Sequence, residues 1–327
     1  MENILVSINC ITYNHENYIS HAIESILMQK TNFKYEILIH DDASSDKTVE
    51  IIKAYQNKYP DLIRPIFQTE NQFTKGVKVH LINIDRAKGK YIANCEGDDF
   101  WTDPYKLQKQ VDYMEKHPEC SLCVHAGNTV NTSNKILSLI RPSKVDRLFS
   151  VDEVIEGGGG LFVTNSMFYR TELAKIKPDF YDITPDITDY PLIINLSLLG
   201  NVYYMNKVMS SYRVGDKDSW TTKNLTDNKK KKEHFSVIAK LLDEVNRYSN
   251  FKYNDAIIRT KRRTELILLL GLDRNLQIAK NKYKDVYLEL GYQKRLVLFL
   301  DYYIPKIAQL LRVAVKKVEV WRMTIQK

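Results

Sequence analysis

The chain has 327 residues, of which 44% are hydrophobic and 11% aromatic, and its formal net charge is +8. This apolar share is sufficient for a buried core and excludes global disorder. The uninterrupted apolar runs are far shorter than the roughly 20 residues that a membrane-spanning helix needs. Because no basic segment precedes the first apolar stretch, we expect no signal peptide and a cytoplasmic location.

The basic charge is concentrated toward the end of the chain. Residues 223–327 carry 24 basic and 11 acidic side chains, whereas residues 1–222 carry 24 basic and 29 acidic ones. We therefore predict an acidic globular domain over residues 1–222 and a basic helical region over residues 223–327. A nucleic-acid-binding protein would place its basic side chains along a folded groove instead, so we expect no nucleic-acid partner.

Strand-like and helix-like segments alternate over about the first 125 residues, which is the pattern of βαβ units and a parallel sheet. We expect strands at residues 4–12, 35–40, 62–68, 91–95 and 121–126. We expect helices between them at residues 15–30, 46–58, 76–87 and 104–116. The sequence therefore predicts an α/β fold with a mostly parallel sheet.

The pattern changes after the fifth strand. Residues 127–160 are irregular and end in the four-glycine run Gly157–Gly160, which predicts a loop. We then expect a strand at residues 161–169, an apolar helix at 187–199, and short strands at 202–205 and 208–213. From residue 223 onward the pattern is helical and basic.

The four cysteines do not predict a metal site. Cys10 and Cys95 lie in apolar strand-like runs, where buried free thiols are expected. Cys120 and Cys123 form a C-x-x-C pair, but no second pair of Cys or His ligands completes a zinc site. We interpret this spacing as coincidental, with a redox pair as the alternative.

Acidic residues follow two of the predicted strands. Asp41 and Asp42 end the second strand, and Glu96, Asp98 and Asp99 end the fourth. In an open α/β sheet, ligands bind at this carboxyl edge, and clustered carboxylates suit Mg²⁺ or Mn²⁺. Neither G-x-G-x-x-G nor a P-loop motif is present. These features favour a nucleotide bound without a glycine-rich loop, its diphosphate neutralised by a metal ion.

The order of these motifs resembles the glycosyltransferases of family 2, which have the GT-A fold. The likeness covers residues 4–213. The matching segments are residues 4–29, 39–48, 87–93, 96–104 and 106–108. The resemblance implies a GT-A domain, a Rossmann-like, mostly parallel sheet, here with a C-terminal helical extension. It also implies an inverting transfer of a sugar from a nucleoside diphosphate, UDP in the first instance, to a hydroxyl of a glycan or lipid-linked glycan in bacterial surface polysaccharide synthesis.

The resemblance assigns the first two strand ends to the nucleotide base. It places Tyr13 where an aromatic ring stacks on uracil, with Thr12 and Asn14 beside it in the donor site. Asp42 would accept a hydrogen bond from the base. The alternative for Asp41 and Asp42 is a turn or helix cap, because aspartate is common before helices.

The resemblance assigns the third group of acidic residues to the ribose and the metal ion. Asp98 would hold the ribose hydroxyls, and Asp99 would ligate the Mn²⁺ or Mg²⁺ that bridges the phosphates. We expect Asp42, Asp98 and Asp99 to meet around one cation in a single cleft. For Glu96, a solvated position and a functional role remain open.

The resemblance also indicates the catalytic base, which must remove the proton of the acceptor hydroxyl. Asp189 begins the apolar helix and is our candidate, with Asp186 as the rival and a plain N-terminal cap as the alternative. A helix N-terminus is expected to keep Asp189 ionised. Gly158–Leu161 and Asn165–Met167 would line the acceptor site.

One position departs from the family pattern. Many members have a histidine shortly after the equivalent of Tyr212-Arg213, and this chain has none there. Arg213 or Lys217 would neutralise the phosphates instead, or Asp216 would ligate the metal ion.

The C-terminal residues carry a second hypothesis. Residues 306–322 have an apolar face with Trp321 and several basic residues elsewhere, which is typical of a membrane-surface helix. Packing on the protein body or on another copy of the chain is the alternative, so peripheral membrane attachment through residues 294–327 and a homo-oligomer both stay open. The competing function is a non-catalytic nucleotide-sugar-binding or glycan-binding protein anchored by this tail.

Overall fold

We describe a computed structural model over residues 4–184, 187–216, 227–270, 281–304 and 306–307. The chain forms two compact units. One comprises Met1–Val130 and Leu139–Arg213, and the other comprises Asn131–Ser138 and Val214–Lys327. The boundary expected after residue 222 lies outside the described residues.

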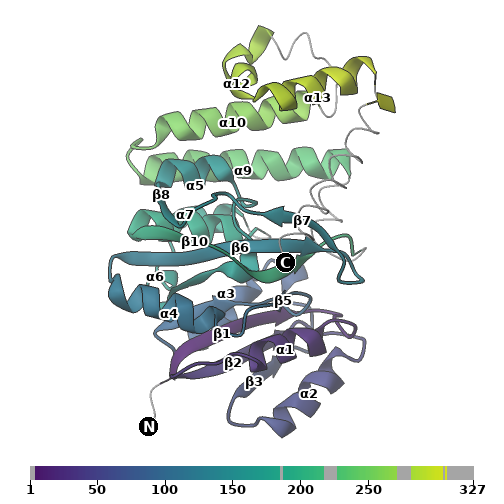
Figure 1. Cartoon of the computed structure of the whole chain (residues 1–327), viewed down its shortest axis with the longest axis vertical. Coiled ribbons are helices and arrows are strands. Elements are labelled where there is room, and N and C mark those ends of the chain that lie inside the picture. Colours follow the sequence, from purple (N-terminus) through teal and green to yellow (C-terminus); the bar gives the residue numbers. More distant parts are fainter. Residues whose placement is uncertain (1–3, 185–186, 217–226, 271–280, 305, 308–327) are drawn as a thin grey trace. The chain divides into compact units, whose positions relative to one another are not determined.

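Within the described residues, a ten-stranded mixed sheet lies mostly in the first unit (Figure 1). Its strands are β1 (Ile4–Thr12), β2 (Lys34–Asp41), β3 (Ile63–Phe67), β4 (Tyr91–Asn94), β5 (Phe100–Trp101), β6 (Cys120–Val130), β7 (Ile136–Ile140), β8 (Arg147–Phe149), β9 (Phe168–Arg170) and β10 (Asn201–Arg213). The main path runs β3-β2-β1-β4-β9-β6-β10-β5. The pairs among β1 to β4 are parallel, and β9 pairs antiparallel with β4 and β6. The expected α/β class is confirmed.

Short helices connect these strands. They are α1 (Ile19–Leu27), α2 (Thr48–Lys58), α3 (Val79–Arg86), α4 (Lys106–Lys116), α5 (Val151–Gly157), α6 (Thr171–Ala174) and α7 (Asp189–Leu199), with 3₁₀ turns at Phe73–Lys75, Thr164–Ser166 and Asp179–Ile183. Helix α3 packs on β1 and β2, and α7 packs on β6. This packing brings the start of α3 and the start of α7 toward one end of the sheet, where the parallel strands end.

The core of this unit is built from alternate residues of the parallel strands, whose apolar side chains point to one face of the sheet. Val6, Ile8 and Cys10 of β1 are fully buried and pack with apolar residues of α1, β2 and β4. All four cysteines are free and buried. The interpretation of Cys120 and Cys123 as an incidental pair, with a redox pair as the alternative, stays a prediction.

Several boundaries differ from the sequence expectations. The first helix begins at Ile19 rather than residue 15, because the preceding residues form a loop with Asn14 at φ 55°. The strand expected at residues 161–169 is a 3₁₀ turn followed by the short strand β9. Within the supposedly irregular segment, α5 forms because Ser150 and Glu153 make a reciprocal capping box.

Helices α9 (Asn228–Tyr248), α10 (Asn254–Leu268), α12 (Lys284–Glu289) and α13 (Tyr292–Tyr303) belong to the second unit. Leu266, Tyr283, Val286 and Tyr287 form a small core there, against which Leu298 packs. Among the described helices, none combines the length and the apolar character needed to cross a membrane. The helix expected at residues 306–322 lies outside the described residues after Ile307.

Candidate active site

The first part of the site is the loop after β1. Thr12 pairs with Asp41 across β1 and β2, and its carbonyl accepts a hydrogen bond from Asp42 N at 3.0 Å. The next residue, Tyr13, is 44% exposed, whereas Thr12 is buried. Tyr13 therefore presents an exposed ring at the carboxyl edge of the sheet, and its stacking on a nucleotide base stays a prediction.

Asn14 fixes this loop rather than facing a ligand. Its backbone N–H donates to Ser44 Oγ at 2.8 Å, and its side-chain oxygen accepts from Ser45 N at 2.8 Å. Its positive φ of 55° is one that asparagine tolerates better than most residues. Asn14 therefore ties the loop after β1 to the loop after β2, and its donor-site role stays a prediction.

Both aspartates at the end of β2 act as caps. Asp41 accepts hydrogen bonds from the backbone and hydroxyl of Ser44. Asp42 accepts from Gln72 N at 2.8 Å and Phe73 N at 3.0 Å, at the start of a 3₁₀ turn. The capping alternative therefore holds for both residues. With both oxygens of Asp42 engaged, its contact with a nucleotide base stays a prediction.

The loop after β4 places its two adjacent aspartates, Asp98 and Asp99, in different environments. The side chain of Asp98 is 23% exposed, and its Oδ2 lies 4.0 Å from Nε2 of His15. Asp99 is 1% exposed; its Oδ1 accepts from Arg213 N at 2.7 Å and its Oδ2 from Asn165 Nδ2 at 2.9 Å. Asp99 thus joins this loop to β10 and to the turn before β9.

These contacts bear on the expected metal site. Asp42 and Asp99 accept hydrogen bonds from protein donors, and of the three predicted carboxylates Asp98 is the accessible one. Within the described ranges no three His, Cys, Asp or Glu side chains form a metal-binding group. The expectation that Asp42, Asp98 and Asp99 surround one cation stays a prediction.

Arg213, at the end of β10, holds the loop after β4 through its side chain. Its Nε donates to the carbonyl of Asp98 at 2.8 Å, and its guanidinium carbon lies 4.3 Å from the centre of the Tyr18 ring. The residue is buried, so it positions the loop that carries Asp98, and contact with phosphates stays a prediction. Lys217 lies outside the described residues. Asp216 lies within them but belongs to the second unit.

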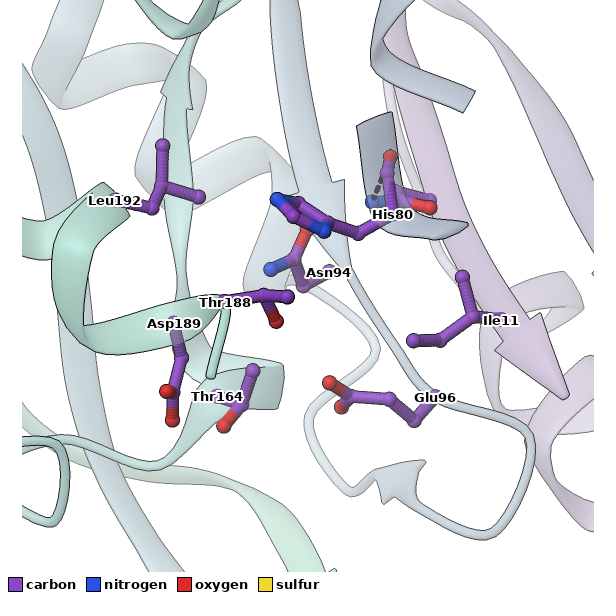
Figure 2. A pocket seen from close by; sticks show the side chains of 9 residues that line it. Ile11, His80, Asn94, Glu96, Thr164, Thr188, Asp189 and Leu192 are labelled. Atoms are coloured by element: carbon purple, nitrogen blue, oxygen red, sulfur yellow. Dashed lines mark hydrogen bonds between the residues drawn. The ribbon is translucent and has the colours of Figure 1, made fainter. Parts of the chain in front are cut away.

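A pocket lies beside this loop and is entirely within the first unit. Figure 2 shows Glu96 on one side, Asp189 and Thr164 on the other, and Asn94 and His80 farther along. Its lining residues are Asn9, Ile11, His80, Asn94, Glu96, Thr164, Thr188, Asp189 and Leu192. The ends of β1 and β4 therefore face the N-terminus of α7 across one cavity, which brings Glu96 and Asp189 to its two sides.

Glu96 has an unusual electrostatic environment. Its Oε2 is buried and has no hydrogen-bond partner. Burial first, and then the charges of Asp98 and Asp189, raise the pKa of Glu96 to about 8. The sequence left open whether Glu96 is a solvated residue or a functional one. The buried, unpaired oxygen and the raised pKa favour a functional role, because a solvated residue at a strand end would have neither.

Asp189 begins α7, as expected, and its Oδ1 accepts from Tyr190 N at 2.7 Å. Burial raises the pKa of Asp189, although the hydrogen bond from Tyr190 opposes this shift. Desolvation therefore outweighs the hydrogen bonds at the helix N-terminus, and the expectation that this N-terminus keeps Asp189 ionised stays a prediction. A Cβ at Gly159 would lie 3.8 Å from Asp189 Oδ1, so the glycine loop passes directly over this carboxylate. Asp186 lies outside the described residues.

Sequence reasoning missed two features of the site. His80 lines the pocket, but no motif singled it out, because a lone histidine in an amphipathic helix carries no signal. Asn165 was expected in the acceptor site, yet it is fully buried and bonds Asp99 and the carbonyl of Ser211.

The residues of this site fall largely within a segment that matches a known family. Residues 7–176, more than half of the chain, match glycosyl transferase family 2. An uncharacterised protein of Mycobacterium tuberculosis is 36% identical over 211 residues, which make up 64% of this chain and 58% of that protein. The match thus spans little more than half the length of this relative.

Two solved structures have the same fold. TarS 1-349 of S. aureus, in complex with UDP-GlcNAc, aligns with a TM-score of 0.57 at 16% identity, over 98% of this chain and 90% of that one. The mannosyltransferase PcManGT of Pyrobaculum calidifontis, in complex with GDP-Man and Mn²⁺, aligns with a TM-score of 0.57 at 14% identity, over 97% and 87%. With the family match and this shared fold, the chain is a glycosyltransferase of family 2 with the GT-A fold.

Proposed function

We propose that this glycosyltransferase transfers a hexose or N-acetylhexosamine, with inversion, from a nucleoside diphosphate donor to a hydroxyl of a glycan or lipid-linked glycan. UDP is the proposed nucleotide, and bacterial surface polysaccharide synthesis is the proposed context. The observation that carries the proposal is the pocket in which Asp189 faces Glu96, directly beside the loop that carries Asp98. The relatives solved with UDP-GlcNAc and with GDP-Man support a nucleoside diphosphate sugar as the donor.

The proposed roles follow from exposure and position. Tyr13 is exposed next to the sheet edge and stacks on the base. Asp189 accepts the proton of the acceptor hydroxyl, and its raised pKa makes it a stronger base than an ordinary aspartate. Tyr190 N orients the carboxylate through its hydrogen bond. The glycine loop that passes beside Asp189 is the proposed wall of the acceptor site.

The donor set fits a divalent cation of the Mg²⁺ or Mn²⁺ type. Glu96 and Asp98 offer hard carboxylate oxygens; burial first, and then the charge of Asp98, which a cation would offset, raise the pKa of Glu96. As the resemblance implies, Asp99 is the proposed metal ligand and Asp98 the proposed ribose contact, with Glu96 as a further carboxylate beside them. The hydrogen bonds of Asp99 to Arg213 N and Asn165 also position the loop. When bound, the ion supplies charge neutralisation to the leaving diphosphate.

The proposal is tested by incubating the full chain with a panel of UDP- and GDP-sugars and measuring nucleotide release, with Mn²⁺ or with EDTA. We expect metal-dependent release from one donor, increased by a glycan acceptor. Binding of UDP and Mn²⁺ in a thermal-shift titration without any turnover would instead favour the non-catalytic alternative.

The Asp189→Asn variant tests the base. Because the amide cannot accept the proton, we expect transfer to fall about 10²–10⁴-fold while UDP binding stays unchanged. Asp179→Asn, at an exposed aspartate of the same segment, is the matched control and should keep wild-type activity. Full activity of Asp189→Asn would remove the assigned role.

We also propose that the second unit attaches the enzyme to a membrane surface. Tyr292, Leu296, Phe299 and Tyr303 recur at helical spacing on α13 and are all exposed, while Leu298 of the same helix packs on the core of this unit. An apolar stripe beside a strongly basic C-terminal sequence suits a membrane of anionic lipids.

A further inference from the structure

His80 is an unexplained polar residue in the wall of the pocket. It is the second residue of α3 and only 6% exposed. Both ring nitrogens, Nδ1 and Nε2, are buried and have no hydrogen-bond partner in the protein. Buried polar atoms in folded proteins almost always have a partner, because an unpaired one costs free energy. Two unpaired nitrogens on one buried ring therefore point to a ligand group that is present when the protein acts.

The neighbouring amides in the pocket are already engaged. The side-chain oxygen of Asn9 accepts from Asn83 Nδ2 at 2.9 Å, and its nitrogen donates to the carbonyl of His80 at 3.5 Å. The side-chain oxygen of Asn94 accepts from the Tyr169 hydroxyl at 3.0 Å. These bonds fix the wall around the imidazole, which lies next to Asn94 in Figure 2.

The ring is neutral under ordinary conditions. Burial, followed by the positive charges of Lys78 and Lys177, lowers the pKa of His80 to about 3. A neutral imidazole has one N–H donor and one acceptor nitrogen. Such a weak base does not compete with Asp189 for the acceptor proton, so binding rather than proton transfer is the chemistry that this ring offers.

Resting on the proposed function, we propose that His80 is a specificity-determining residue that hydrogen-bonds a hydroxyl of the sugar being transferred. The pocket extends from Asp189 to the ends of β1 and β4. An inverting transfer requires the base near the anomeric carbon, so the sugar ring attached to the nucleotide must occupy the space between the base and this strand edge. A hydroxyl both donates and accepts, and it is therefore complementary to the two kinds of nitrogen on a neutral imidazole.

The inference predicts strong discrimination against a donor that lacks this hydroxyl. A deoxy sugar would leave the imidazole buried and unpaired in the complex, and sites built to bond a hydroxyl reject such analogues. We expect a loss of about tenfold or more in kcat/KM on one monodeoxy donor, with smaller effects at the other ring positions.

The experiment compares wild type with His80→Phe, which keeps the ring volume and removes both nitrogens. The donor identified by the nucleotide-sugar screen and its monodeoxy analogues are measured for kcat/KM. We expect His80→Phe to lower kcat/KM on the parent donor about tenfold relative to wild type. On the deoxy analogue that wild type rejects, we expect His80→Phe and wild type to have the same kcat/KM. His80→Asn keeps one donor and one acceptor and should recover part of the discrimination. His117→Phe, at a histidine whose side chain is 41% exposed and which does not line the pocket, should behave as wild type.

Binding separates this inference from the proposed function. Calorimetric affinities of UDP and of the intact UDP-sugar are measured in the Asp189→Asn background. We expect His80→Phe to weaken UDP-sugar binding about tenfold and to leave UDP binding unchanged. The role of His80 would be overturned if His80→Phe lowered kcat/KM equally on the parent donor and on every deoxy analogue, or lowered it on none of them. One further outcome separates the two proposals. If the wild-type enzyme transfers no sugar, but His80→Phe still binds the intact UDP-sugar more weakly than wild type does, the proposed function is overturned and this inference is supported.

Discussion

Glu96 and Asp189 show how burial controls single residues at this site. Each carboxylate comes from a different element, and each has its pKa raised mainly by loss of solvent. Glu96 also faces the charge of Asp98, with no hydrogen-bond donor at its Oε2. Burial and neighbouring charge therefore favour the protonated form of Glu96 in the free protein.

Glu96→Gln should increase stability in a pH-dependent way. In the folded protein Glu96 has a pKa of about 8, against 4.5 for an ordinary glutamate, so between these values the folded state binds a proton that the unfolded state does not. Stability therefore falls as pH rises from about 4.5 to 8. Glu96→Gln removes this loss, and its gain in melting temperature over wild type should widen from pH 5 to pH 8.

The measurement is thermal unfolding of the metal-free protein at several pH values. Glu50→Gln, at an exposed glutamate of α2, is the control and should follow the wild-type curve. A constant difference between Glu96→Gln and wild type across this range would contradict the assigned ionisation.

At the scale of elements, one buried asparagine joins three parts of the fold. Asn165, in the 3₁₀ turn before β9, donates to Asp99 Oδ2 at 2.9 Å and to the carbonyl of Ser211 in β10 at 2.8 Å. The backbone carbonyl of Asn165 accepts a hydrogen bond from Trp101 Nε1 at 3.0 Å. The loop after β4, the turn and β10 are thereby held together, which fixes where Asp98 lies.

Asn165→Leu should be strongly destabilising. It leaves Asp99 and the carbonyl of Ser211 buried without their donor, and a loss of about 3 kcal/mol in the free energy of unfolding is expected. Urea unfolding provides the measurement. Asn57→Leu, at an exposed position of α2, should change stability by no more than about 0.5 kcal/mol. Equal stability of the two variants would show that this network does not hold the loop.

At the scale of the whole molecule, charge and apolar surface are divided between the two units. Residues 1–222 carry an excess of acidic side chains and residues 223–327 an excess of basic ones. The exposed apolar stripe on α13 belongs to the basic unit. The candidate active site thus belongs to one unit and the proposed membrane-binding surface to the other.

The triple variant Leu296→Ser, Phe299→Ser, Tyr303→Ser should lose membrane binding. Each side chain removed from contact with lipid forfeits about 1.5–3 kcal/mol at full burial, so the partition coefficient should fall at least about tenfold. Flotation with liposomes containing anionic lipid provides the measurement, and nucleotide release in solution should remain unchanged. Equal flotation of the variant and wild type would exclude α13 as the attachment surface.

Local sequence was sufficient for much of the fold. The alternation of apolar strands with amphipathic helices predicted the parallel sheet of β1 to β4, because period and burial are encoded residue by residue. The position of Asp189 at the start of an apolar helix was predicted in the same way and is confirmed by α7. The run of acidic residues after β4 marked the edge at which the pocket lies.

Tertiary structure decided what each acidic side chain does. Asp98 and Asp99 are adjacent in sequence, yet one is accessible and the other is enclosed by Asn165 and Arg213, which follow far along the chain. The proposed role of His80 was equally hidden, since the position of its ring in the pocket wall depends on the packing of α3 on β1 and β2. Sequence determined which chemical groups stand at the edge of the sheet; long-range packing decided which of them face the pocket, because hydrogen bonds and desolvation depend on neighbours that local sequence does not specify.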